Sequence, residues 1–100
     1  MGLGFALSEE IVRERGHTLN PSFRDYKMFT ALDMPKIIPI IVEVPEPLGP
    51  YGARGVAEST AIPTAAAIAN AVANAINVRI KTLPLSPERV LAALKQKSKE

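Results

Sequence analysis

The chain contains no cysteine and no tryptophan, and it has a single histidine. Without cysteine it forms no disulfide within itself, no thiolate metal site and no iron–sulfur ligation. The one histidine, His17, has no cysteine, aspartate or histidine at ligand spacing, so we assign it no metal. The lack of cysteine suits a cytoplasmic protein, which is the location we expect.

Aromatic residues are also scarce: they make up 5% of the chain, although hydrophobic residues make up 47%. A core must therefore be built from isoleucine, valine, leucine and many alanines, and alanine contributes little burial energy per residue. One hundred residues suit a single segment, residues 1–100, with no second domain. We expect this segment to pack against a further layer, either part of a larger protein or another copy of itself.

Neither sign of charge dominates, since 12 basic and 10 acidic residues leave a net charge of only +2. No aromatic side chains alternate with the basic ones, so we expect no nucleic-acid partner. The most apolar stretch, residues 61–78, is mostly alanine and carries Pro63 and three asparagines, which argues against a membrane span. The first residues lack a basic start and a small-residue cleavage site, so we also expect no leader peptide.

The spacing of apolar residues predicts three helices and two short strands. Leu3, Leu7 and Ile11 lie four apart, which predicts a helix over residues 2–15 that Gly16 ends. An alanine-rich helix follows Ser59 or Thr60 as its cap, and a last helix begins at residue 86 with serine, proline and glutamate. Residues 17–35 are expected to form an extended, packed connection.

The two predicted strands are residues 40–44, which are rich in β-branched side chains, and residues 78–83, which alternate between apolar and polar. The fold class is therefore α+β, with short strands and three helices. Two short strands make a poor sheet alone, so the pattern indicates a fragment of a larger domain or an assembly that supplies more strands.

The most informative run is GPYGARGVAE at residues 49–58, which places three glycines within seven residues and then delivers Glu58 to the start of the alanine-rich helix. Glycines permit tight backbone conformations and leave space for a bulky group to approach the main chain. Taken alone, Glu58 is explained as a carboxylate that stabilises a helix N-terminus by roughly 0.3–1 kcal/mol.

Five segments, in order, carry a wider resemblance. They are GLGFALSEE at 2–10, YKMFTALDMP at 26–35, the loop at 49–58, the helix from Thr64 and LPLSPERV at 83–90. Together they resemble the C-terminal segment of the molybdenum-binding large subunit of the xanthine dehydrogenase and aldehyde oxidase family, which includes aerobic carbon monoxide dehydrogenase. The resemblance implies that the chain is a fragment of the larger molybdopterin-binding domain.

In that family the glutamate of the glycine-rich loop is the active-site base for oxidative hydroxylation of an aldehyde or a heterocycle. The resemblance implies this catalytic role for Glu58. It also implies that the preceding residues line the substrate and cofactor side of the loop: Gly52, Ala53, Arg54, Gly55, Val56 and Ala57.

The resemblance implies molybdopterin in the complete enzyme, but the loops that hold it lie upstream of the matched segment. We therefore expect this chain alone to hold no cofactor and to be inactive. Its partners would be the remainder of the large subunit together with iron–sulfur and flavin subunits, and an isolated chain would self-associate as a homo-oligomer to cover its apolar faces.

The chain departs from the family pattern at Phe29, Arg54 and Ala57. An alanine methyl beside the base can crowd the metal site or forbid a positive φ, which would retune or abolish activity. Arg54 has two interpretations: it binds an anionic substrate or cofactor phosphate, or it pairs with a local carboxylate, Glu46 or Glu58. The second is the commoner use of a loop arginine.

Two other functions remain open. One is a non-catalytic scaffold or interaction protein that keeps the fold and has lost the chemistry, which Ala57 and the missing cofactor loops favour. An anion-binding module built on the glycine loop is the weakest of the three, because Glu58 would repel the anion. Asp33 is expected to be a turn residue that bonds to nearby backbone.

Overall fold

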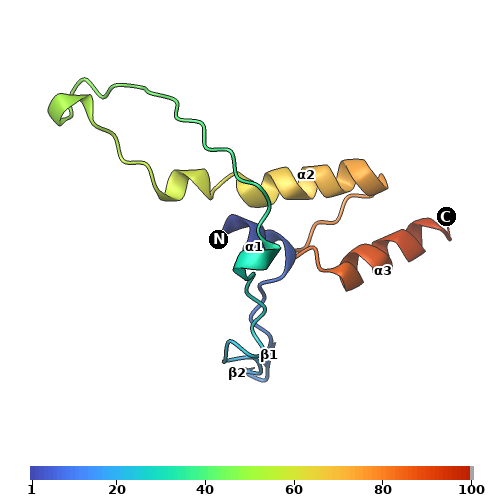
Figure 1. The fold of residues 1–100 in the computed structure, drawn as a ribbon. Coiled ribbons are helices and arrows are strands. Elements are labelled where there is room, and N and C mark those ends of the chain that lie inside the picture. Colours follow the sequence, from blue (N-terminus) through green and yellow to red (C-terminus); the bar gives the residue numbers. More distant parts are fainter. Residues whose placement is uncertain (100) are drawn as a thin grey trace.

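The protein is described by a computed structural model that covers residues 1–99 (Figure 1). Its regular structure comprises three α-helices, one short β-hairpin and three 3-10 helices, which confirms the α+β class with short strands and three helices. In chain order they are α1 (Gly2–Leu7), β1 (Arg13–Glu14), β2 (His17–Thr18), η1 (Ala31–Asp33), η2 (Pro50–Gly52), η3 (Glu58–Thr60), α2 (Thr64–Ile76) and α3 (Pro87–Lys97).

The small core lies around α1, whose residues Gly2, Gly4 and Ala6 are buried. Helix α2 packs across it so closely that a Cβ atom on Gly2 would lie 2.6 Å from the Cβ of Thr64. On another side, the backbone N–H of Leu85 donates to the carbonyl of Ala6 at 2.6 Å, and the Leu85 side chain is only 4% exposed. Glycine in α1 therefore allows close packing of the neighbouring segments.

The predicted helix over residues 2–15 is wrong in length, because α1 ends at Leu7. The N–H groups of Ser8 and Glu9 both donate to the carbonyl of Gly4 at 2.9 Å, which closes the last turn. Beyond it, the Asn20 side chain accepts from the N–H of Val12 at 2.9 Å and donates to the carbonyl of Glu10 at 2.7 Å. These side-chain bonds offer the backbone an alternative to the helix.

Gly16 does not end a helix; it forms the turn of a hairpin. Arg15 and Gly16 have φ angles of 47° and 86°, and β1 pairs antiparallel with β2, Glu14 opposite His17. Positive φ at both turn residues matches the right-handed twist of the flanking strands. Gly16, directly after Arg15, therefore belongs to a hairpin turn, which the spacing of apolar residues did not indicate.

Neither predicted strand is found in residues 1–99: both 40–44 and 78–83 lack regular structure. Residues 35–48 instead run out as part of an extended arm that leaves the body of the molecule and returns toward α2 (Figure 1). Ile40, Ile41 and Val42 are 82%, 85% and 79% exposed. A strand requires a second backbone to bond with, and within the described residues only β1 and β2 pair with each other.

Helix α2 begins at Thr64, later than the predicted cap at Ser59 or Thr60. Those two residues belong to η3, where the Thr60 hydroxyl donates to the carbonyl of Ala57 at 2.8 Å instead of capping a helix. The C-terminal end of α2 is closed by Asn77, whose φ of 53° places it in the left-handed region.

The predicted start of α3 is confirmed. Ser86 is its N-cap and accepts from the backbone N–H of Arg89 at 3.4 Å. The Arg89 side chain also ties α3 to the core region, because it donates to the carbonyl of Pro84 at 2.9 Å and pairs with Glu10 at 2.6 Å.

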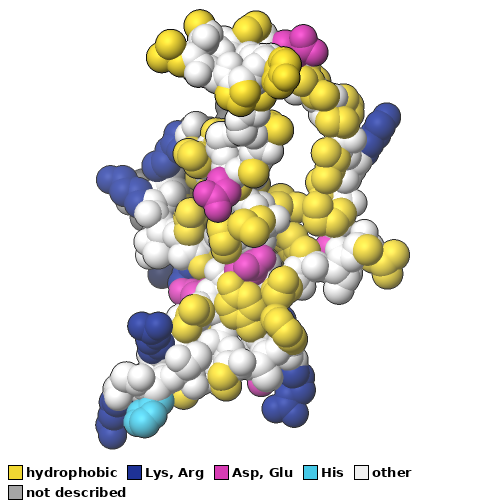
Figure 2. Space-filling view, turned by 90° about the vertical axis from the view of Figure 1, so that its left-hand side faces the viewer, with side chains coloured by type: hydrophobic (Ala, Val, Ile, Leu, Met, Phe, Trp, Pro, Cys, Tyr) yellow, Lys and Arg dark blue, Asp and Glu magenta, His cyan; other side chains and the backbone are white. Residues whose placement is uncertain are grey.

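The described chain is extended, with a radius of gyration of 18.0 Å against about 13 Å for a compact chain of this length. Figure 2 shows hydrophobic side chains following the arm and also gathered on the body. No helix among residues 1–99 is both long and apolar enough to cross a membrane.

Candidate functional site

The loop that precedes Glu58 closes on itself. The backbone N–H of Glu46 donates to the carbonyl of Gly52 at 3.1 Å, and the N–H of Gly49 donates to the carbonyl of Glu46 at 3.1 Å. We call residues 46–54 the closed loop. Its backbone bonds make it a local structure that does not depend on the rest of the arm.

Both carboxylate oxygens of Glu46 are used inside the closed loop. Oε1 accepts from the N–H of Leu48 at 3.3 Å, and Oε2 accepts from Nη2 of Arg54 at 3.3 Å. The interpretation in which Arg54 pairs with a local carboxylate is therefore confirmed, with Glu46 and not Glu58 as the partner.

Two of the three loop glycines have a structural reason to be glycine. Gly52 has a φ of 73°, next to Tyr51 at 55°. A Cβ on Gly49 would lie 3.0 Å from the carbonyl oxygen of Ala53. Gly55 has a φ outside the left-handed region and open space around the position of a Cβ, so it leaves the backbone accessible at this point.

Glu58 is exposed and is the first residue of η3. Its carbonyl accepts from the N–H of Ala61 at 2.9 Å, but its carboxylate makes no hydrogen bond or ion pair within residues 1–99. It therefore does not cap η3 or α2 by a hydrogen bond. Ala57, beside it, has a φ of −148°, so alanine is not forced into a positive φ here.

The other predicted loop residues, Ala53, Val56 and Ala57, are exposed, and so is Gly55. The structure thus brings Arg54 and Gly52 into the closed loop and leaves residues 55–57 as a short exposed connection to Glu58. In this arrangement the Glu58 carboxylate is accessible, and the nearest arginine along the chain is already occupied.

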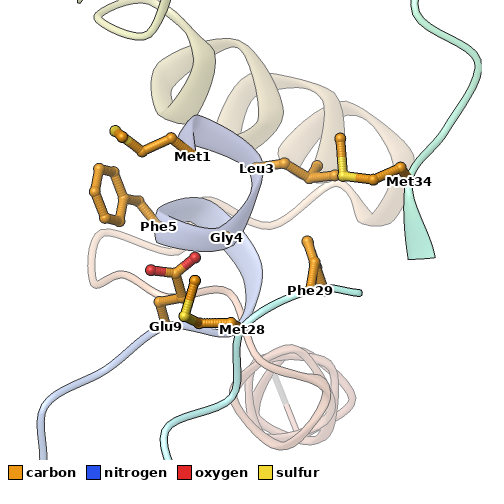
Figure 3. Close-up of a pocket in the computed structure, with 8 residues that line it drawn as sticks. All are labelled: Met1, Leu3, Gly4, Phe5, Glu9, Met28, Phe29 and Met34. Carbon is orange, nitrogen blue, oxygen red and sulfur yellow. The ribbon is translucent and has the colours of Figure 1, made fainter. Parts of the chain in front are cut away.

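A pocket of about 360 Å³ lies at α1, and its lining residues come from the N-terminal third of the chain (Figure 3). It is lined by residues of α1, by the residues that flank this helix and by the connection after the hairpin: Met1, Leu3, Gly4, Phe5, Glu9, Met28, Phe29 and Met34. Its walls are mostly apolar, and Glu9 supplies the carboxylate seen beside Met28 in Figure 3. Glu58 is not among the lining residues.

Tyr26 fixes the carboxylate of this pocket, since its hydroxyl donates to Oε2 of Glu9 at 2.9 Å. That hydrogen bond, together with burial and the nearby negative charge, raises the pKa of Tyr26. The sequence predicts a helix that includes residues 2–10 and an extended connection that includes residues 26–35, but it does not predict the contact between them. The signal was a glutamate in the first motif and a tyrosine in the second.

No three histidine, cysteine, aspartate or glutamate side chains within residues 1–99 gather where they could hold a metal ion. Two carboxylates, those of Glu46 and Glu58, lie near the glycine loop. Only Glu58 is available as an oxygen ligand, because Glu46 is paired with Arg54. Within residues 1–99 the side chains do not fit as a ligand set for a metal ion.

Comparison with known proteins gives consistent relatives. Residues 1–35 match the molybdopterin cofactor-binding domain family. The xanthine dehydrogenase molybdenum-binding subunit of Escherichia coli O157:H7 is 46% identical over 92 residues, which are 90% of this chain and 12% of that protein. The aldehyde oxidoreductase of Megalodesulfovibrio gigas is 38% identical over 96 residues, 94% of this chain and 10% of that protein.

Among solved structures, the crystal structure of quinoline 2-oxidoreductase from Pseudomonas putida 86 matches with a TM-score of 0.86 and 33% identity. The match covers 95% of this chain and 13% of that one. The chain therefore spans about an eighth of the length of its relatives, and its extended shape, arm included, is shared with a segment of a much larger protein.

Proposed function

This chain belongs to the family of molybdenum-binding large subunits that includes xanthine dehydrogenase and aldehyde oxidoreductase, and on that premise we propose that it supplies the active-site base, Glu58, of a molybdenum hydroxylase. The substrate class is an aldehyde or an electron-poor heterocycle. Residues 52–57 would form the border of the site next to this base.

One observation carries the proposal: the Glu58 carboxylate is exposed and unpaired within residues 1–99, while Arg54 is held by Glu46. A general base must be ionised and must reach the proton that it removes. An ion pair with Arg54 would have turned the carboxylate toward the loop. Because Glu46 takes that role, Glu58 is free to face a reacting group.

In the proposed reaction, a carboxylate oxygen of Glu58 accepts the proton of the hydroxyl group that attacks the electron-poor carbon of the substrate. The C–H bond at that carbon breaks as the C–O bond forms, its hydrogen leaves finally as a proton, and the molybdenum cofactor, when bound in the complete subunit, would take up the two electrons. Gly55 leaves the main chain open beside the base, so a bulky group can approach there. We place the residues that hold the cofactor on the remainder of the large subunit.

The proposed partners are that remainder and, for removal of electrons, iron–sulfur and flavin subunits. The exposed arm supports a larger partner, since a run of β-branched side chains left in water is otherwise unfavourable. Ile37, Ile38 and Val44 are 68%, 68% and 53% exposed. Packing of this run against the rest of the subunit would remove it from water.

The second candidate is a non-catalytic scaffold that self-associates. The same exposed arm favours it, because two copies could cover each other's apolar side chains. In that case Glu58 has no chemical role, and the native assembly holds copies of this chain only.

Substitution of Glu58 by glutamine in the complex with its partner chains tests the base. The amide keeps the size but cannot take a proton, so we expect kcat to fall by about 10²–10⁴-fold with assembly intact. Glu43→Gln is the matched control, an exposed glutamate of the arm that bears no hydrogen bond or ion pair within residues 1–99. Full activity of Glu58→Gln would refute the assignment.

A further inference from the structure

We infer that Glu46 and Arg54 are positioning residues, whose contact fixes the closed loop so that Glu58 is presented at a defined place. The inference rests on the proposed function of Glu58 as the base and adds the residues through which the fold controls it. Arg54 belongs to the loop that borders the proposed site, but the role inferred here acts through its contact with Glu46 and not through a contact with substrate or cofactor.

Glu46 is the hub of the closed loop. Its backbone donates to Gly52 and accepts from Gly49, and its carboxylate accepts from Leu48 and Arg54. Four hydrogen bonds thus converge on one residue, two through its main chain and two through its side chain. The Arg54 contact is the one that reaches furthest along the chain toward Glu58.

The path from the closed loop to the base is short. Arg54 is anchored on Glu46, and Ala57 is anchored by the Thr60 hydroxyl, which donates to its carbonyl at 2.8 Å. Between these two anchors lie only Gly55 and Val56, both exposed. Arg54 and Ala57 are three residues apart in the sequence, so their Cα atoms lie at most about 11 Å from each other, and a fixed Arg54 restricts where the turn that carries Glu58 can lie.

The ion pair is partly exposed: the Arg54 side chain is 53% exposed and that of Glu46 is 36% exposed. Pairs in such surroundings contribute little to global stability. Loss of this pair is therefore expected to displace the base and leave folding and assembly unchanged. A displaced base in a chain that folds and assembles normally would distinguish a positioning role from a merely structural one.

The first test measures the loop in the full chain, without activity. Arg54→Met keeps the length of the side chain but removes its charge, and we expect amide hydrogen exchange at Glu46 and Gly49 to become about threefold faster or more, because opening of the loop is easier. Exchange at Leu85, which bonds to α1, serves as the internal reference. Unchanged exchange at Glu46 and Gly49 would overturn the inference.

The second test measures turnover in the complex with the partner chains. Arg54→Met and Glu46→Gln are each expected to lower kcat about tenfold with KM little changed, because a misplaced base slows chemistry more than binding. The double variant should be no worse than either single one, since both remove the same contact. Arg54→Lys, which keeps the charge, should recover part of the loss.

Glu43→Gln is the control for Glu46→Gln: it removes the same negative charge, and Glu43 lines the hollow beside Arg54 without pairing with it in residues 1–99. Faster exchange with unchanged kcat in Arg54→Met would overturn the positioning role. An active Glu58→Gln variant is a different result, which refutes the base itself while the exchange data still report on the loop.

Discussion

Single residues decide how closely the segments around α1 approach each other. Gly2 lies against Thr64 at the start of α2, and Gly4 lies against the Glu9 carboxylate that Tyr26 holds. A side chain at either position would meet these groups. The core is small, so such local contacts account for much of what keeps α1, α2 and the segment at Leu85 together.

Substitution of Gly2 by alanine tests this packing. The added methyl group would lie 2.6 Å from the Cβ of Thr64, so α1 and α2 must separate. We expect the free energy of unfolding to fall by about 1–3 kcal/mol, measured by urea denaturation of the full chain. Gly55→Ala, where a Cβ meets open space, should change it by less than about 0.5 kcal/mol. Equal stability of the two variants would contradict the packing.

At the candidate site, the sequence predicted that Arg54 pairs with a local carboxylate but left Glu46 and Glu58 both open as the partner, and the structure selects Glu46. The contact between Glu9 and Tyr26 was not anticipated, since it joins residues 17 apart that only the fold brings together. The catalytic role of Glu58 stays a prediction drawn from the family resemblance.

Elements with local signals were predicted best. The start of α3 follows from its own residues, with Ser86 as cap, and α2 follows from its alanines. The helix predicted over residues 2–15 was too long because the Asn20 side chain, eight residues beyond Val12, bonds that part of the backbone. The spacing of apolar residues carries no information about a distant side chain that competes with the helix for backbone hydrogen bonds.

The 3-10 helix η1 gives a pH-dependent prediction. Asp33 accepts from the hydroxyl and the N–H of Thr30, both at 2.7 Å, which confirms it as a turn residue and lowers its pKa below the ordinary 3.8. A lowered folded-state pKa means that the contribution to stability is present above the unfolded value and is lost as pH falls through the folded one. The η1 turn should therefore persist at pH 4 and weaken below it.

The measurement for η1 is an NMR titration that follows the amide of Thr30. Its chemical shift should change with a midpoint below 3.8, because that N–H reports on the Asp33 carboxylate. Asp25, which pairs with Arg24 on the surface, is a second carboxylate of the same connection for comparison. In Asp33→Asn the Thr30 transition should disappear, and a midpoint at or above 3.8 in the unaltered chain would contradict the account.

At the scale of the whole molecule, the strand predicted for residues 40–44 failed for a reason outside the segment. Its β-branched side chains and extended backbone suit a strand, but no described residue pairs with it. The radius of gyration of 18.0 Å has the same origin, since the arm is held away from the small core. Sequence patterns predicted the need for a further layer, and within residues 1–99 the apolar side chains of the arm stay exposed.

We propose that this chain works as the base-bearing part of a molybdenum-binding subunit. The most direct test of this proposal is the native mass and molybdenum content of the chain purified from its own cells under mild conditions, at its natural level of expression. We expect the chain to elute with large partner chains and with stoichiometric molybdenum. A metal-free assembly that contains copies of this chain alone would contradict it and would leave Glu58 without a catalytic role.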